Sequence, residues 1–116
     1  MEIDVLFTGV SVRDFDAAQG WYERFFGRTA DVVANEQEEM WRLMDRGWLY
    51  IVRDADRAGN SIVALAVPDI EAATSVLDSR GIACGPILRE GDAGRKAVVH
   101  DPDGNTIAII EVAGDG

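Results

Sequence analysis

The sequence predicts an α+β fold built from two tandem βαβββ modules, and three observations carry this prediction. Residues 12–18 (VRDFDAA) return in similar form at 67–73 (VPDIEAA). Each copy follows a short apolar run and opens a helix-like stretch that ends at a glycine, Gly27 or Gly81. Strand-like segments then follow each copy. A repeated supersecondary unit of this kind sets most of an architecture, and two similar units facing each other create a cleft.

The first module is predicted over about residues 4–53. Residues 5–13 are rich in β-branched side chains and form a strand, after which Asp14 stands where a helix N-cap is expected. An apolar stripe at helical spacing follows, and Gly27 ends the helix. The Arg46-Gly47 pair suits a hairpin turn. The stripe comprises Ala18, Trp21, Tyr22, Phe25 and Phe26, and the later strands are expected at 29–34, 38–45 and 47–53.

A polar, turn-rich linker at residues 54–61 leads to the second module, predicted over about 62–112. We expect a strand at 62–67 and a helix at about 69–80. Further strands are expected at 82–88, 95–100 and 105–112. The Asp101-Pro102-Asp103-Gly104 segment is a turn, because proline presets φ at its second position and glycine tolerates positive φ. Both modules form one domain over residues 1–116.

The amino-acid composition and net charge argue against some classes of function. The chain has 116 residues, of which 47% are hydrophobic, and a formal net charge of −10. This acidity argues against nucleic-acid binding and is compatible with a cationic ligand. No apolar run approaches the length of a membrane span. The single Cys84 cannot form an internal disulfide, so we expect a cytoplasmic protein.

Two motifs resemble those of the vicinal oxygen chelate superfamily, which includes glyoxalase I, extradiol dioxygenases and bleomycin-resistance proteins. Val12-Arg13-Asp14 followed by Trp21-Tyr22 resembles the start of its modules, and Asp101-Pro102-Asp103-Gly104-Asn105 resembles its closing turn. The resemblance spans about residues 4–112. It implies that each module curls its four strands and that paired modules enclose a cavity. Enzymes of the family bind a divalent metal there through His, Glu or Gln side chains.

The resemblance implies four metal-ligand positions, and this sequence places Phe7, Tyr50, Ile62 and Ala108 at them. None carries an imidazole or a carboxylate, so we expect no metal and no cofactor. Glu111 is expected on the opposite strand face from Ala108, and a register slip would be needed to bring it into the cavity. His100 cannot build a site alone, although a contact with ligand stays open.

Alternation along the strands predicts a mixed aromatic and small-residue wall for the cavity. Aromatic rings there would stack on a planar or cationic ligand. Trp41, Trp48 and Tyr50 could instead fill the core or a dimer contact. The predicted ligand-binding residues are Phe7, Ser11, Trp41, Trp48, Tyr50, Ile62, Ala108 and Ile110.

The sequence therefore favours a non-catalytic protein that binds a small molecule, similar to bleomycin-resistance proteins. We expect the ligand to be aromatic, or both aromatic and cationic. An antibiotic is one compound of this class. The resemblance further implies a homodimer whose modules pair across chains. Two alternatives stay open: a metal-dependent glyoxalase-like lyase or dioxygenase, and an interaction module with a vestigial cleft.

Overall fold

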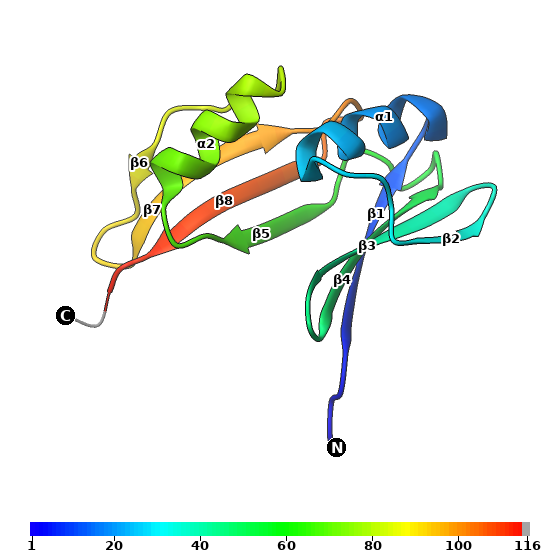
Figure 1. Cartoon of the computed structure of the whole chain (residues 1–116), viewed down its shortest axis with the longest axis horizontal. Coiled ribbons are helices and arrows are strands. Elements are labelled where there is room, and N and C mark those ends of the chain that lie inside the picture. The colour runs from blue at the N-terminus through cyan, green and yellow to red at the C-terminus, as the bar shows by residue number, and fades with distance from the viewer. Residues whose placement is uncertain (115–116) are drawn as a thin grey trace.

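The computed structural model describes residues 1–114 as two four-stranded mixed sheets, each with one helix (Figure 1). In the first module the sheet order is β1-β4-β3-β2, with β1 and β4 parallel. Its elements are β1 (Leu6–Val12), α1 (Phe15–Phe26), β2 (Val32–Asn35), β3 (Glu38–Met44) and β4 (Gly47–Arg53).

The second module repeats this topology, with sheet order β5-β8-β7-β6 and β5 parallel to β8. The predicted α+β fold of two βαβββ modules is confirmed. Its elements are β5 (Ile62–Ala66), α2 (Ile70–Ser79), β6 (Leu88–Arg89), β7 (Gly94–His100) and β8 (Thr106–Val112).

The repeated aspartates cap both helices, as the sequence predicts. Asp14 accepts a hydrogen bond from the Ala17 backbone N–H, and Asp69 accepts one from that of Ala72, both at 3.1 Å. Gly27 takes a left-handed conformation, φ +74°, and ends α1 with a bond from its N–H to the Glu23 carbonyl. Each cap satisfies a backbone group that the end of a helix leaves without an intrahelical partner.

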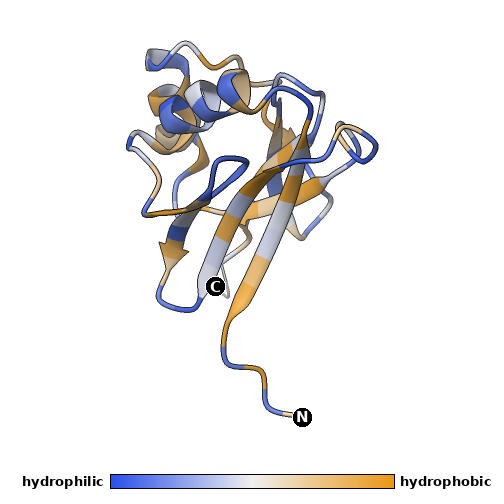
Figure 2. Cartoon of the chain, turned by 90° about the vertical axis from the view of Figure 1, so that its right-hand side faces the viewer, coloured by the Kyte–Doolittle hydropathy of each residue, from blue (hydrophilic) through white to orange (hydrophobic). Residues whose placement is uncertain are grey.

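One face of each sheet packs against its helix and forms the core. Val10, Leu49 and Ile51 are fully buried under α1, and Ile107 is fully buried in the second module. The alternation of hydrophobic and polar positions is visible along the strands in Figure 2. This alternation explains why the faces of β1, β4, β5 and β8 could be predicted from period two.

The predicted strand at 82–88 is wrong for most of its length. Strand β6 comprises Leu88 and Arg89, and the preceding segment contributes one ladder-like bond, from the Gly85 N–H to the Val98 carbonyl at 2.9 Å. Pro86 has no N–H to donate, so regular pairing with β7 cannot continue through it. The second sheet therefore ends in a short edge strand.

Polar contacts join the two modules, in addition to a hydrophobic core cluster that contains residues of both. The Tyr22 hydroxyl of α1 donates to Asp101, which follows β7, at 2.8 Å, and both side chains are buried. Arg80, at the end of α2, donates to the Phe25 carbonyl at 2.9 Å. In Figure 1 the helices α1 and α2 lie along the upper side of the molecule, and residues 1–5 extend away from its body. No helix within residues 1–114 is long and apolar enough to cross a membrane.

Candidate functional site

The face of the first sheet opposite α1 carries the predicted aromatic wall. Strand register pairs Phe7 with Trp48 and Gly9 with Tyr50, which places these residues on one face. The rings of Phe7 and Trp48 stack with centroids 5.9 Å apart and an interplanar angle of 20°. Phe7 nevertheless remains 51% exposed. A flat apolar surface is therefore open to a ligand or to another protein surface.

The corresponding face of the second sheet carries small and aliphatic side chains along β5 and β8. Ile62 pairs with Thr106, and Ala64 pairs with Ala108, so these four residues share a face. Ile62 is 79% exposed, whereas Ala108 is buried. Ile110 lies further along the same face of β8 and is half-buried. His100 pairs with Thr106 and is exposed at the end of β7.

A cavity of about 530 Å³ lies on the first sheet, between its open face and the linker. Ser11 and Tyr50, two of the residues predicted to bind a ligand, line it. The linker residues in the lining are not among the predicted ligand-binding residues, because no strand or helix periodicity describes the path of the linker. The cavity, here called the polar cavity, is lined by Gly9, Ser11, Glu38, Tyr50, Val52, Asp54, Arg57, Asn60 and Ser61.

The Tyr50 ring lies directly across β1 at Gly9. A Cβ placed on Gly9 would come within 2.5 Å of the Tyr50 Cζ and Oη atoms. The absence of a side chain at position 9 therefore allows the ring to lie against the strand. The glycine thus sets the position of the aromatic residue in the polar cavity.

The polar cavity carries a net negative charge. Its charged residues are Glu38, Asp54 and Arg57. Arg57 forms an ion pair with Asp54, their Nε and Oδ2 atoms 3.8 Å apart. Glu38 has no ion-pair partner among residues 1–114. Glu38 and Tyr50 line the same cavity, and a carboxylate and an aromatic ring both attract a cationic group, the one through its charge and the other through the ring quadrupole.

Trp41 does not belong to this site, which corrects the prediction from sequence. Its side chain is fully buried on the helix face of β3, and its indole N–H donates to the Arg28 carbonyl at 3.0 Å. Its ring lies 6.1 Å from that of Tyr22 and 5.4 Å from that of Phe26, measured between centroids. Trp41 is therefore a core residue of the first module.

The predicted metal-ligand positions do not suit a divalent cation. Phe7 and Tyr50 lie on the open face of the first sheet, and Ile62 and Ala108 lie on that of the second. Metal sites of the expected type need several nitrogen or oxygen ligands that converge. Three of these side chains are hydrocarbons, and the fourth is a phenol.

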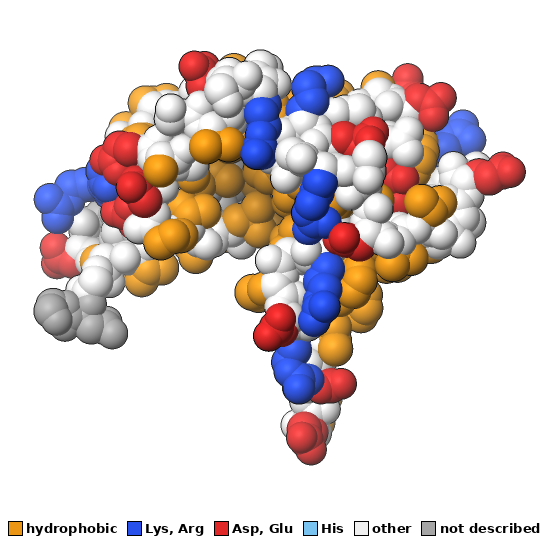
Figure 3. Space-filling view, in the orientation of Figure 1, with side chains coloured by type: hydrophobic (Ala, Val, Ile, Leu, Met, Phe, Trp, Pro, Cys, Tyr) orange, Lys and Arg blue, Asp and Glu red, His pale blue; other side chains and the backbone are white. Residues whose placement is uncertain are grey.

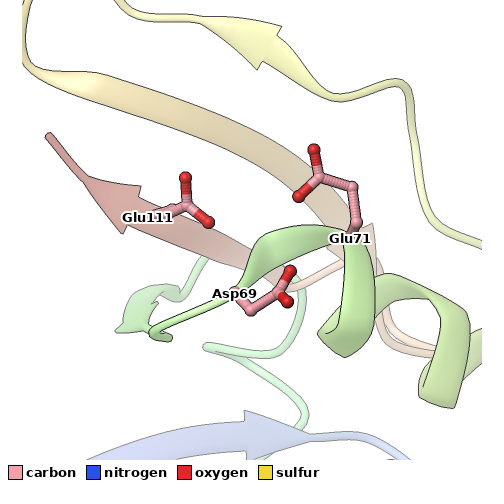
Figure 4. Close-up of side chains that lie close together, drawn as sticks. All are labelled: Asp69, Glu71 and Glu111. Carbon is pink, nitrogen blue, oxygen red and sulfur yellow. The ribbon is translucent and has the colours of Figure 1, made fainter.

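Three carboxylates do converge elsewhere, at the start of α2: Asp69, Glu71 and Glu111 (Figure 4). Arg95 donates to both Glu71 and Glu111, and this contact holds the pKa of each carboxyl below its usual range. Glu111 also accepts the Ile70 N–H at 2.9 Å. The cluster lies on the helix side of β8, where the sequence places Glu111, and its charge is offset by the guanidinium.

A second cavity, of about 760 Å³, lies around the open edge of β5 and is called the apolar groove. Phe25, Phe26, Leu43 and Met44 line it from the first module. The second module contributes residues of β5 and α2. Figure 3 shows hydrophobic side chains gathered in the hollow between the two sheets. An apolar surface of this kind is typical of an interaction site.

The chain belongs to the Glyoxalase/Bleomycin resistance protein/Dioxygenase superfamily, whose sequence profile matches residues 4–109. The doubled βαβββ topology and the open sheet faces fit this assignment. No curated protein sequence matches the chain.

Among solved structures, the chain is similar to a glyoxalase / bleomycin resistance protein from Catenulispora acidiphila DSM 44928. The two share 36% identity with a TM-score of 0.87, covering 93% of this chain and 97% of the other. TnmS3, an antibiotic binding protein from Streptomyces sp. CB03234, is 23% identical with a TM-score of 0.78, covering 97% and 99%.

A bleomycin-binding protein solved in complex with bleomycin is also similar. It is 21% identical to this chain with a TM-score of 0.74, and the match covers 94% of this chain and 98% of the other. The two more distant likenesses establish the fold. The residues of the site therefore decide what is proposed for this chain.

Proposed function

We propose that this protein binds a small aromatic cation in the polar cavity and on the adjoining aromatic surface, without transforming it. The observation that carries the proposal is the set of residues at the superfamily's metal-ligand positions. Phe7, Tyr50, Ile62 and Ala108 offer apolar and aromatic contacts in place of metal coordination. The usual Lewis-acid chemistry of the superfamily has no ligand set to hold its metal at these positions.

The proposed ligand class follows from the side chains of the polar cavity and of the adjoining aromatic surface. The stacked Phe7 and Trp48 rings and the Tyr50 ring offer flat faces to a planar group. Glu38 and Asp54 outnumber Arg57 in the cavity, which favours a positive charge on the ligand. Sequestration of an aromatic or aromatic-cationic antibiotic is the function that combines these features, as the names of two structural neighbours also suggest.

We further propose that the functional unit is a homodimer in which a module of one chain faces a module of its partner. Within the described part of the chain, residues 1–114, strands β1 and β5 each have one edge without a neighbouring strand. Both carry exposed apolar side chains, Phe7 at 51% and Ile62 at 79%. Exposed apolar edges of this kind favour pairing with another chain. If the partner chain also covers the apolar groove in this contact, a sheet face of each chain would together enclose a cleft.

A reducing, cytoplasmic location is proposed as well. Cys84 is half-buried, and burial raises the pKa of its thiol, so it suits packing better than reactivity. The chain contains no second cysteine with which it could form an internal disulfide. Retention of the full-length protein in a cytosolic fraction is the corresponding test.

Tryptophan fluorescence tests the proposed binding, because Trp48 is half-exposed on the same sheet face as Tyr50, whereas Trp21 and Trp41 are buried. Titration with proflavine, bleomycin and other DNA-binding antibiotics should quench or shift the Trp48 emission. We expect at least one dissociation constant below about 100 μM, which corresponds to roughly −5.5 kcal/mol. Failure of the whole panel would count against sequestration and favour a vestigial cleft.

Elemental analysis separates this proposal from metal-dependent lyase or dioxygenase activity. Protein purified without chelator should contain zinc, nickel, manganese or iron far below one equivalent per chain. A stoichiometric metal would contradict the proposal and would require ligands other than those at the four superfamily positions.

A further inference from the structure

We infer that Asn105 is a positioning residue for the polar cavity, an inference that rests on the proposed function and adds a residue outside the cavity to it. Asn105 is 1% exposed and does not line the cavity. Its side chain contacts two residues that do: Ser11, in β1 of the first module, and Ser61, at the end of the linker. The amide therefore connects the β1 side of the cavity wall to its linker side, from a buried position outside the cavity.

The amide of Asn105 uses its nitrogen as a donor twice and its oxygen as an acceptor in this role. Its Nδ2 donates to the Ser11 carbonyl and to Asp101 Oδ2, each at 2.9 Å. Its Oδ1 accepts the Ser61 backbone N–H at 2.9 Å. A donor pair and an acceptor are needed at once, which an amide provides and neither a carboxylate nor an aliphatic side chain can supply.

Asp101 holds Asn105 in this orientation. Its Oδ1 accepts the backbone N–H groups of Asp103 and Asn105, each at 2.9 Å, and its Oδ2 also accepts the Tyr22 hydroxyl. The pKa of Tyr22 is raised by burial and by the neighbouring Asp101 charge, so the hydroxyl stays a donor. The two motifs that mark the superfamily resemblance thus meet in one buried network.

The linker is pressed closely against the same turn. Gly59 has φ +91°, and a Cβ there would lie 2.7 Å from the Asp103 carbonyl oxygen. The Arg13 N–H donates to Asp103 Oδ1 at 3.0 Å. The end of β1 and the end of the linker therefore both depend on the 101–105 turn for their positions. Movement of this turn would alter the shape of the polar cavity.

The test compares Asn105→Ala with Tyr22→Phe, a variant that removes a bond to Asp101 but leaves the bonds to Ser11 and Ser61. Proflavine affinity is measured by fluorescence at a temperature where circular dichroism shows both variants folded. Exchange of the Ser61 amide proton is followed by NMR. We expect Asn105→Ala to weaken proflavine binding and to speed Ser61 exchange at least tenfold, and Tyr22→Phe to change each less than threefold.

Three results would contradict the inference. Equal losses of affinity in the two variants would show a general effect of stability, and unchanged affinity in Asn105→Ala would exclude positioning. Unchanged Ser61 exchange would show that the amide does not hold the linker. Wild-type protein that binds neither proflavine nor bleomycin would instead overturn the proposed function, and the positioning role with it.

Asn105→Asp is the second test variant, to be used if Asn105→Ala does not fold. Its carboxylate keeps the acceptor for the Ser61 N–H, but when ionised it has no donor for Ser11 and lies beside the Asp101 charge. We expect weak proflavine binding at pH 8 that recovers toward the wild-type value, measured at the same pH, near pH 5. A variant that binds as tightly as wild type at pH 8 would contradict the inference.

Discussion

Glu39 is the residue whose environment departs most from ordinary protein chemistry. Its side chain is 2% exposed under α1, where Gln19 donates to Oε2 at 2.9 Å. The other oxygen, Oε1, is buried and has no hydrogen-bond partner in the part of the chain that the structure describes. Burial raises the pKa of this carboxyl, and the nearby Glu23 charge raises it further. An unsatisfied buried charge of this kind lowers stability.

Glu39→Gln should therefore stabilise the protein at neutral pH, by about 1 kcal/mol. Because the folded-state pKa lies above the unfolded value, the stability contributed by Glu39 is present below the unfolded pKa of about 4.3 and is lost as pH rises through the folded pKa. Urea unfolding at pH 5 and pH 8 measures this difference, with exposed Glu36→Gln as the control. A less stable Glu39→Gln variant at pH 8 would contradict this interpretation.

Gly9 offers a second test, directed at the site. An alanine Cβ would collide with the Tyr50 ring, so Gly9→Ala should displace the ring from the cavity. We expect about a tenfold loss of proflavine affinity, or about 1.4 kcal/mol, with the fold retained. Gly20→Ala is the matched control, because a Cβ at Gly20 meets no atom within 4 Å. Unchanged affinity in Gly9→Ala would mean that the position of Tyr50 does not matter for binding.

At the scale of the helices, sequence and structure agree closely because both N-caps and the apolar stripes obey local rules. Asp14 and Asp69 start their helices, and Trp21, Tyr22 and Phe25 are buried as their spacing predicts. The two caps differ in one respect. Asp69 lies close to Glu71 and Glu111, whereas Asp14 belongs to no such cluster of three carboxylates among residues 1–114.

Asp14→Ala should lower the free energy of unfolding by about 1 kcal/mol, the usual contribution of a helix cap. Asp69→Ala should cost less, because removing Asp69 also relieves repulsion from Glu71 and Glu111. Urea unfolding of the two variants at pH 7 and low salt measures both effects. An equal or larger loss for Asp69→Ala would show that this repulsion is negligible.

Strand β3 shows where sequence reasoning reaches its limit. Glu38, Met40 and Arg42 share one face, and Glu39, Trp41 and Leu43 share the other. Each face mixes charged and apolar residues, so period two could not decide which was buried. Because Glu39 is buried on the core face, that face of β3 is no more apolar in sequence than the open face. Trp41 was consequently assigned to the cleft, although it lies in the core.

The cleft itself was predictable only where it rests on regular strands. The sharing of one face by Phe7, Trp48 and Tyr50 followed from alternation and parallel register. Arg57, Asn60 and Ser61 lie in or at the end of an irregular linker, which contacts the 101–105 turn through Gly59 and Ser61. Contacts between residues this far apart in sequence leave no periodic signal in a single chain.

At the scale of the whole molecule, β1 and β5 are edge strands, each with one edge that no other strand within residues 1–114 covers. Ile62→Lys should shift the proposed dimer toward monomer, because a lysine at this exposed apolar position would be buried in the contact. Val33→Lys is the matched control, since Val33 is 68% exposed on β2, at the outer edge of the first sheet.

Analytical ultracentrifugation of the wild type and both variants measures this shift. We expect a dimer for the wild type and for Val33→Lys, and at least a tenfold weaker association for Ile62→Lys. A monomeric wild type would contradict the dimer, and an unaffected Ile62→Lys variant would place the interface elsewhere.

The central claim is that the cleft binds an aromatic cation through its own side chains, without a metal. Calorimetric titration of proflavine into the wild-type protein and Tyr50→Ala, each with excess EDTA, tests it most directly. The account predicts a dissociation constant below about 100 μM for the wild type with chelator present, and at least tenfold weaker binding for Tyr50→Ala. Wild-type binding that disappears with EDTA and returns with added zinc or nickel would contradict it.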